Sequence, residues 1–360
     1  MENKTRHAIG LMSGTSLDGV DLVYVKFLIE PGYSFEILES ESVEYSELWK
    51  KRLTEAFTES GENLMALDAD YGEFLSKLVL NFIRVKNIKK IDLIASHGHT
   101  IFHQPDKKYT LQIGNGAIMA AMTDYKVICD FRTQDVALGG QGAPLVPIGD
   151  ELLFSEFDFC LNLGGFANIS YADKGTRKAF DICPVNIVLN QYTRSIGLEF
   201  DDKGQMAAEG QVHELLLDEL NNLEFYRMSH PKSLGFEYVT KSIFPLIEAY
   251  PMELKDILRT YAEHAAVQIA KVVNEVENFN PGSNSRLLVT GGGAYNDFFI
   301  QRLRHHLKAE VVIPDADIIE FKEALIFALL GVLRDQRKVN CLKSVTGASK
   351  DHSSGVVYQI

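Results

Sequence analysis

Two segments of the chain share a pattern in which a glycine-bearing turn separates two apolar stretches. In the first, residues 13–19 are rich in turn formers and lie between the apolar residues 8–12 and 20–28. In the second, Gly164 and Gly165 lie between two apolar stretches. Short apolar runs bounded by turn residues predict β-strands joined by tight hairpins. The recurrence predicts two halves that each begin with a meander of strands.

Further strands and longer helical segments are expected after each meander. The other expected strands are 34–43, 91–96, 178–183 and 286–290. Apolar residues at helical spacing predict helices at 46–86, 184–196, 211–222, 253–278, 296–308 and 319–336. This order predicts an α/β protein, and 360 residues are enough for two domains.

The pattern of strands and helices breaks in a glycine-rich segment at residues 138–144. We therefore expect an N-terminal α/β domain at 1–135, completed by residues near 340–360. A C-terminal α/β domain would occupy residues 136–340 and carry the second glycine turn.

The composition excludes several classes of partner. The formal net charge of −13 repels nucleic acid and anionic membranes, so we expect neither as a partner. The longest apolar run, residues 324–333, is too short to span a bilayer, and residues 1–10 lack an apolar signal core. Four scattered cysteines show no metal-ligand spacing and indicate free thiols in a reducing cytoplasm.

The glycine turns are candidate phosphate-binding loops. Glycine lets the backbone approach a ligand closely, and successive amides can point at phosphate oxygens. The first turn could equally be a tight hairpin, and it is not a Walker A loop because the GK[ST] ending is absent. A third turn at residues 290–296 lies between a strand and a helix, where a helix N-terminus can receive an anion. Three such turns together favour binding of a nucleoside triphosphate.

Two acidic residues are candidates for chemistry. Asp181 is placed at the end of a strand, where a carboxylate can act as a general base. From this segment alone a helix N-cap or turn residue is the favoured interpretation. Glu323 opens the apolar helix, where the helix dipole is a sufficient reason for a carboxylate.

A cluster of three histidines, His97, His99 and His103, invites a zinc interpretation. No cysteine or carboxylate accompanies the cluster at ligand spacing, so recognition of sugar hydroxyls or structural hydrogen bonds are favoured, and we assign no metal site. Arg132 lies between Asp130 and Asp135. It could pair internally or present its fork to a substrate carboxylate.

Residues 9–21 (IGLMSGTSLDGVD) resemble the signature of the anhydro-N-acetylmuramic acid kinases. Further matches in the same order are ASHG (95–98), LQIG (111–114), DFR (130–132), GGQGAPLVP (139–147), NLGG (162–165), GGGA (291–294), EA (323–324) and TGA (346–348). The resemblance therefore covers almost the whole chain.

The resemblance implies a two-domain actin/hexokinase-like (ribonuclease H-like) fold with ATP and Mg²⁺ in the cleft between the domains. It implies that ATP and water open the 1,6-anhydro bond of anhydro-N-acetylmuramic acid and that O6 is phosphorylated, giving N-acetylmuramic acid 6-phosphate in cell-wall recycling. It also implies a homodimer. A phosphoryl transfer of this kind depends mostly on positioning and charge neutralisation.

The resemblance also implies roles for individual residues. Asp181 matches the catalytic aspartate that removes a proton from the attacking water, and His97, Arg132 and Glu323 are expected near the sugar. The implied nucleotide-binding residues are Gly14, Thr15, Ser16, Leu17, Asp18, Gly19, Val20, Asp21, Asn162, Gly164, Gly165, Gly291, Gly292, Gly293 and Asn296.

The chain departs from the family pattern after Asp181, where Thr-Gly-Pro-Gly-Asn is usual and Ile-Cys-Pro-Val-Asn stands at 182–186. His99 replaces a usual Gln, and Phe236 stands where an Arg is common. These departures leave two alternatives. One is a kinase of the same fold that phosphorylates another sugar without ring opening, and the other is a non-catalytic protein that binds a nucleotide or a sugar.

Overall fold

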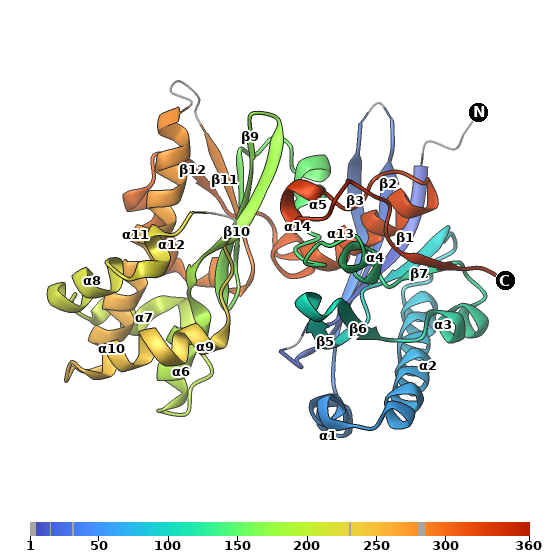
Figure 1. Cartoon of the computed structure of the whole chain (residues 1–360), viewed down its shortest axis with the longest axis horizontal. Helices are drawn as coiled ribbons and strands as arrows, with labels where there is room; N and C mark the ends of the chain where they lie inside the picture. The colour runs from blue at the N-terminus through green and yellow to red at the C-terminus, as the bar shows by residue number, and fades with distance from the viewer. Residues whose placement is uncertain (1–4, 15, 31, 230–231, 280–284) are drawn as a thin grey trace. The chain divides into compact units, whose positions relative to one another are not determined.

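The computed structural model describes residues 5–14, 16–30, 32–229, 232–279 and 285–360. The chain forms two compact units (Figure 1). Unit 1 comprises Met1–Leu153 and Phe321–Ile360, and unit 2 comprises Phe154–Glu320. Each unit is described by itself.

Unit 1 is built on a six-stranded sheet with the order β13-β7-β4-β1-β2-β3. β1, β2 and β3 form an antiparallel meander, while β4 and β7 run parallel to β1. The strands are β1 (Thr5–Met12), β2 (Gly19–Leu28), β3 (Ser34–Glu44), β4 (Leu93–Ser96), β7 (Val127–Cys129) and β13 (Val356–Tyr358). A separate hairpin joins β5 (His99–Gln104) to β6 (Tyr109–Ile113).

Unit 2 repeats this arrangement in a five-stranded sheet with the order β10-β9-β8-β11-β12. Its first three strands are again an antiparallel meander, and the last two run parallel to the first. The strands are β8 (Phe159–Leu163), β9 (Phe166–Asp173), β10 (Thr176–Pro184), β11 (Arg286–Thr290) and β12 (Glu310–Val312). The predicted fold class is confirmed, because both units are α/β and share one strand order, as in the actin/hexokinase superfold.

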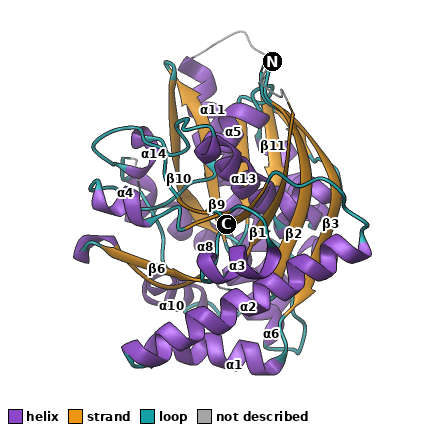
Figure 2. Cartoon of the chain, turned by 90° about the vertical axis from the view of Figure 1, so that its right-hand side faces the viewer, coloured by secondary structure: helices purple, strands orange, loops and turns teal. Residues whose placement is uncertain are grey.

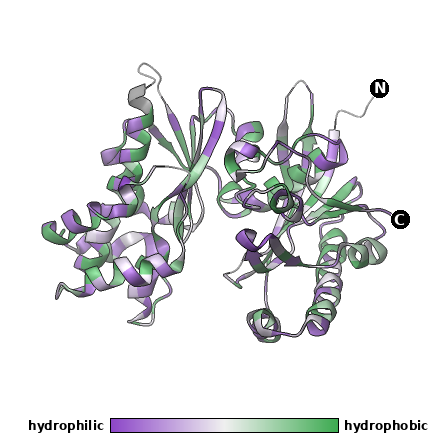
Figure 3. Ribbon diagram, viewed as in Figure 1, coloured by the Kyte–Doolittle hydropathy of each residue, from purple (hydrophilic) through white to green (hydrophobic). Residues whose placement is uncertain are grey.

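Helices cover both faces of the unit 1 sheet. Alternate residues of β1 face opposite sides: Ile9 and Leu11 share a core with α2, whereas Gly10 faces α13. α2 crosses one face in Figure 2, and in Figure 3 it carries hydrophobic and hydrophilic residues intermixed along its length, as expected of a helix with one buried side. The helices are α1 (Glu47–Glu55), α2 (Gly61–Val85), α3 (Gly116–Thr123), α4 (Thr133–Ala137), α5 (Pro147–Leu153), α14 (Lys343–Thr346) and α13 (Ala316–Asp335), whose first five residues belong to unit 2.

The core of unit 2 gathers around α11, whose buried residues pack with the strands and with α6 and α8. The helices of this unit are α6 (Asn186–Arg194), α7 (Gln205–Glu209), α8 (Glu214–Asn221), α9 (Phe236–Tyr238), α10 (Phe244–Glu248), α11 (Leu254–Phe279) and α12 (Asp297–His306). Among the described helices of either unit, none is long and apolar enough to cross a membrane.

The units divide the chain at 153/154 and 320/321, whereas the sequence placed the division at 135/136 and near 340. The physical reason lies in α5 and α13. Asp150 of α5 forms a buried ion pair of 2.7 Å with Lys322 of α13, and a Cβ at Gly149 would lie only 2.5 Å from Ile326. These contacts hold α5 against α13, and α13 in turn packs on β1 of unit 1, where a Cβ at Gly10 would meet Ala324 and Ala328.

Candidate active site

The first glycine turn joins β1 to β2 in unit 1. Gly19 is required by close packing, because a Cβ there would lie 2.3 Å from the carbonyl oxygen of Val43. Leu17 adopts a positive φ of 62°, which few residues with a side chain do. Gly14 leaves more space, since Ser16 Oγ, at 3.3 Å, is the nearest described atom to an added Cβ. Thr15 lies outside the described residues.

A chain of hydrogen-bonded, buried polar side chains starts at Ser13, the first residue of this turn. Ser13 Oγ lies 2.8 Å from His99 Nδ1 and 2.6 Å from the hydroxyl of Tyr45, which lies 2.5 Å from the hydroxyl of Tyr71. Burial lowers the pKa of His99 to about 4, so this imidazole is neutral at pH 7. Ser13 belongs to the predicted turn, but no pattern in the sequence singles out Tyr45 or Tyr71. Their grouping depends on the meander, which brings the start of β2 beside the end of β3.

Arg132 and His97 are held together in the same unit. Arg132 donates from Nε and Nη2 to His97 Nε2 at 3.1 and 2.9 Å, and from Nη1 to the Gly142 carbonyl at 2.7 Å. His97 Nδ1 lies 2.8 Å from the Gly98 carbonyl and therefore carries the proton. Burial and the neighbouring charge of Arg132 hold the pKa of His97 well below its ordinary value.

The three histidines do not form a metal site among the described side chains. His97 binds Arg132, His99 contacts Ser13, and His103 Nδ1 lies 3.1 Å from the Thr110 hydroxyl. All three histidines thus make structural hydrogen bonds, which is one of the two roles expected for them, and recognition of sugar hydroxyls is the other.

Glu323 lies on α13, beside Arg132. α13 can approach β1 closely because Gly10 has no side chain: a Cβ there would lie 2.1 Å from the Ala324 carbonyl oxygen. Burial lowers the pKa of Arg132, and the negative charge of Glu323 acts in the opposite direction. The expectation that Glu323 opens its helix is wrong, because α13 begins at Ala316 and the helix dipole does not explain this exposed carboxylate. Unit 1 thus gathers Arg132, Glu323 and the first glycine turn.

Unit 2 brings the second and third glycine turns together. Gly291 has a φ of 81°, and a Cβ there would lie 2.5 Å from Asn162 Oδ1, while one at Gly293 would lie 2.7 Å from Leu163 Cβ. The Gly165 carbonyl accepts the backbone N–H of Val185 at 2.8 Å. The two turns therefore pack backbone against backbone, next to the start of α6. Asn296, predicted in the third turn, caps α12 by accepting the Phe299 N–H at 2.9 Å.

Asp181 lies on β10, and both its backbone and its side chain are fixed by residues 232–234. Its N–H donates to the Lys232 carbonyl at 3.1 Å, and its Oδ2 accepts the Leu234 N–H at 2.8 Å. Burial raises the pKa of this carboxyl, and the Leu234 hydrogen bond opposes the rise. Asp181 is neither a helix cap nor the end of a strand. A bulge between Asp181 and Cys183 lets β10 continue pairing as far as Pro184.

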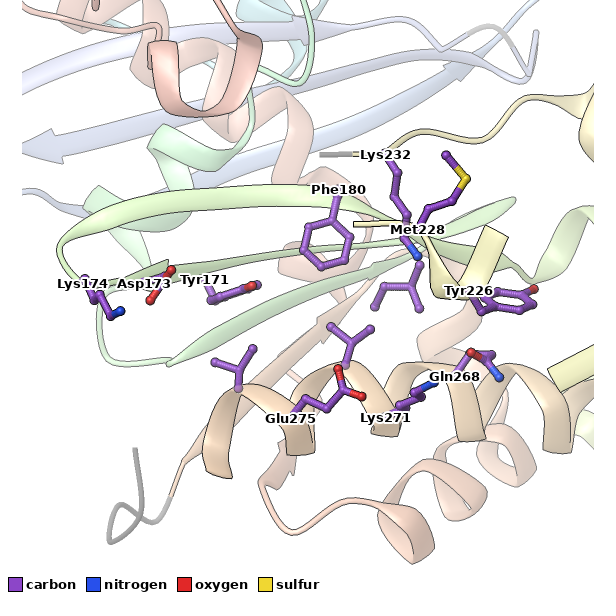
Figure 4. Close-up of a pocket in the computed structure, with 13 residues that line it drawn as sticks. Tyr171, Asp173, Lys174, Phe180, Tyr226, Met228, Lys232, Gln268, Lys271 and Glu275 are labelled. Carbon is purple, nitrogen blue, oxygen red and sulfur yellow. The ribbon is translucent and has the colours of Figure 1, made fainter. Parts of the chain in front are cut away.

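A separate pocket of about 630 Å³ lies in unit 2 between β9, β10 and α11 (Figure 4). Phe180 and Ile182 line it, whereas Asp181, which stands between them in sequence, does not. Lys232 and Lys271 point into it from opposite sides. None of the predicted site residues lines this pocket.

Known proteins that resemble this chain match it over nearly its whole length. The sequence profile of the anhydro-N-acetylmuramic acid kinase family matches residues 6–360. The chain belongs to the anhydro-N-acetylmuramic acid kinase family. The anhydro-N-acetylmuramic acid kinase of Aliivibrio fischeri is 35% identical over 366 residues, covering 97% of this chain and 98% of that protein. The one from Haemophilus influenzae is 34% identical over 383 residues, covering 99% and 98%.

Solved structures with a similar course of the chain are more distant. The component A of (R)-2-hydroxyglutaryl-CoA dehydratase from Acidaminococcus fermentans is 12% identical, with a TM-score of 0.45 over 90% of this chain and 96% of that one. The ROK hexokinase of Thermus thermophilus is 13% identical, with a TM-score of 0.39 over 91% and 99%.

The resemblance to the anhydro-N-acetylmuramic acid kinases, inferred from the sequence motifs, is confirmed by the family match. This is a phosphotransferase family of cell-wall recycling, and a kinase family implies ATP use.

Proposed function

We propose that this protein uses ATP and water to convert 1,6-anhydro-N-acetylmuramic acid into N-acetylmuramic acid 6-phosphate. The single observation that carries the chemistry is the setting of Asp181. Its carboxylate is half-buried and held by one backbone N–H, and its pKa is raised. A carboxylate whose pKa moves toward neutrality is a better proton acceptor at physiological pH than an ordinary one.

The proposed reaction needs one base. Asp181 takes a proton from the water whose oxygen attacks C1 of the sugar. The bond between C1 and O6 breaks, O6 attacks the γ-phosphorus, and ADP leaves. The water oxygen therefore stays on C1, and the phosphoryl group moves to O6. Binding the reactants in line supplies most of the remaining acceleration.

The nucleotide is proposed to bind through the three glycine turns. Gly14 to Asp21 would hold phosphate on unit 1, while Asn162 to Gly165 and Gly291 to Gly293 would hold phosphate and nucleoside on unit 2. Support comes from the close packing of the latter two turns. Asp18 and Asp21 offer the hard oxygen ligands that Mg²⁺ prefers, and a bound Mg²⁺ would neutralise phosphate charge.

Arg132 and Glu323 are proposed to bind the sugar. A guanidinium has five N–H donors, and the described contacts of Arg132 use three of them, on His97 and Gly142. The remaining two can receive the lactyl carboxylate of the substrate. His97 would then orient Arg132 rather than contact the sugar.

A second candidate is a kinase of the same fold that acts on another sugar without ring opening. Of the departures from the family pattern, Ile182, Cys183 and Val185 have side chains buried in the core of unit 2, and His99 is buried in unit 1. Only Phe236, which is 51% exposed, presents a changed side chain to solvent among these residues. Phe236 is therefore the changed residue that could alter which sugar binds, and it is the observation that favours the second candidate.

One experiment separates the two candidates. Purified protein, ATP and Mg²⁺ are incubated in ¹⁸O-water with anhydro-N-acetylmuramic acid, N-acetylmuramic acid or N-acetylglucosamine, and the products are analysed by mass spectrometry. We expect phosphorylation of the anhydro sugar with one ¹⁸O at C1. Faster phosphorylation of N-acetylmuramic acid or N-acetylglucosamine than of the anhydro sugar would support the second candidate. A phosphorylated anhydro sugar without ¹⁸O would exclude the hydrolytic mechanism.

The proposal includes a cytoplasmic homodimer. None of the four cysteines forms a disulfide, as expected in a reducing compartment. The dimer is implied by the family alone, and light scattering of the purified protein would measure it.

A further inference from the structure

Three side chains that are far apart in sequence converge at one buried point in unit 1. Asp135 lies on α4, and Cys341 and His352 lie on either side of α14. The three residues are 0%, 1% and 6% exposed. The Cys341 thiol donates to Asp135 Oδ1 at 3.1 Å, His352 Nε2 lies 3.6 Å from the same oxygen, and one ligand atom from each residue falls within 4.8 Å of the others. α4 and α14 are neighbours in both views (Figures 1 and 2).

His352 presents an unused nitrogen to this point. Its Nδ1 lies 3.2 Å from the Lys350 carbonyl, which can only accept, so Nδ1 carries the proton. Its Nε2 is buried, has no hydrogen-bond partner among the described residues, and faces Asp135. A histidine whose second ring nitrogen donates to a backbone carbonyl is the usual arrangement of a metal ligand.

The backbone holds these three residues in fixed positions. Cys341 and His352 form an isolated β-bridge, with N–H to carbonyl distances of 3.1 Å in both directions. The second oxygen of Asp135 accepts the Gly142 N–H at 2.7 Å, and the first also accepts the Thr346 hydroxyl at 2.7 Å. A site that is fixed before binding needs little reorganisation to receive a ligand.

We propose that Asp135, Cys341 and His352 form a structural zinc site. Sulfur, imidazole nitrogen and carboxylate oxygen are the three donor types that Zn²⁺ takes in proteins. Bond lengths of about 2.0–2.3 Å place tetrahedral ligand atoms roughly 3.3–3.8 Å apart. The nitrogen–oxygen distance of 3.6 Å falls in this range, whereas the sulfur–oxygen distance of 3.1 Å has to lengthen when a metal replaces the thiol proton. A thiolate, a carboxylate and a neutral imidazole around Zn²⁺ give a neutral buried group, with Thr346 or a water left for the fourth position.

The site would act on the sugar-binding region through Gly142. The Gly142 N–H donates to Asp135, and its carbonyl accepts from Arg132. Gly142 needs its positive φ of 69°, and the glycine-rich loop that carries it closes onto Asp135. A zinc ion would thus fix the loop that holds Arg132, without touching the substrate.

The competing arrangement is a metal-free cluster, in which the Cys341 thiol keeps its proton and donates it to Asp135. Metal analysis of the full-length protein distinguishes the two. The untagged protein is purified without chelator, its metals are measured by mass spectrometry, and the metal-depleted protein is titrated with Zn²⁺ and Co²⁺. We expect about one zinc per chain and a thiolate-to-cobalt charge-transfer band.

Variants of the proposed ligands test whether any bound zinc sits at Asp135, Cys341 and His352. We expect Cys341→Ser and His352→Gln each to weaken zinc binding at least 100-fold and to abolish the cobalt band. Cys129→Ser, which changes another buried thiol of unit 1, should leave both unchanged. Circular dichroism and native mass spectrometry check that the variants fold. Wild-type protein that neither retains zinc nor gains thermal stability from added Zn²⁺ would overturn the proposal, as would zinc that persists equally in both ligand variants.

Discussion

The two units share one strand order but use it in different ways. Next to its first turn, unit 1 buries the polar side chains of Ser13, His97 and His99, and His97 is hydrogen-bonded to the half-buried Arg132. At the equivalent turn, unit 2 packs the glycines of the third turn against Asn162 and Leu163 of the second turn and adds one carboxylate, Asp181. Unit 1 therefore supplies mainly polar side chains to the candidate site, whereas unit 2 supplies glycine turns and one carboxylate that can act as a base.

This difference separates binding from chemistry. Side chains that are already hydrogen-bonded to one another, such as Arg132 and His97, are suited to orient a substrate. A lone carboxylate with a raised pKa is suited to move a proton. We therefore expect variants in unit 1 to change substrate affinity and variants at Asp181 to change turnover.

The largest expected effect tests this division directly. Asp181→Asn should lower kcat by about 10²–10⁴, the range for loss of a general base, while ATP still binds. Glu323→Gln in unit 1 should act mainly on KM for the sugar. Steady-state kinetics and nucleotide titrations measure both effects. Asp173→Asn, at the far end of the same pair of strands, is the matched control and should leave both parameters unchanged.

The pH dependence of kcat/KM follows from the same residue. Because burial raises the pKa of Asp181, activity should decline as the pH falls through that raised value, above the range of an ordinary aspartate. An unchanged turnover number in Asp181→Asn would remove this residue as the base and with it the proposed difference between the units.

Acid should destabilise unit 1 before unit 2. His97 and His99 in unit 1, and His264 in unit 2, are buried and have lowered pKa values, to about 4 for His99 and about 3 for His264. A histidine whose folded pKa lies below its unfolded value adds stability above pH 6.5, and this stability is lost as the pH falls. Each histidine contributes a slope of about 1.4 kcal/mol per pH unit between pH 6.5 and its folded pKa.

Unit 1 has two buried histidines with a lowered pKa and unit 2 has one, so the unfolding free energy of unit 1 should fall more steeply with decreasing pH. Hydrogen exchange measured between pH 6.5 and 4, peptide by peptide, would show it. His99→Asn should reduce the slope of unit 1 alone, and His264→Asn that of unit 2 alone. Equal slopes in the wild-type protein would contradict the comparison.

Local patterns predicted the repeated part of the molecule well. The meanders, the long helices and the glycine turns are signals within a few residues, and all of the principal ones form. Short elements such as β7, β12 and β13 have only three residues each and are stabilised by pairing, so the periodicity did not reveal them. Asp181 was misplaced at a strand end because a bulge leaves no mark in the pattern of apolar residues.

Long-range groupings could not be predicted for a different reason. Asp135 meets Cys341 only because the C-terminal segment returns to unit 1 and adds β13 to its sheet. The partner of Arg132 is His97, 35 positions earlier, and no motif spacing joins these two residues. Such contacts depend on topology, so spacing along the chain carries no information about them.

The smallest expected effect concerns a pair of helix caps. Asn115 caps α3 in unit 1 by accepting the Ile118 N–H at 3.1 Å, as Asn296 caps α12 in unit 2. Asn296→Ala should cost about 1 kcal/mol of unfolding free energy. Asn115→Ala should cost more, because Asn115 also donates to Asp68 at 2.8 Å. Asn296→Asp keeps a capping oxygen but removes the amide donor. Stability retained together with weaker ATP binding in Asn296→Asp would assign Asn296 to the nucleotide as well, whereas unchanged ATP binding would restrict it to the cap.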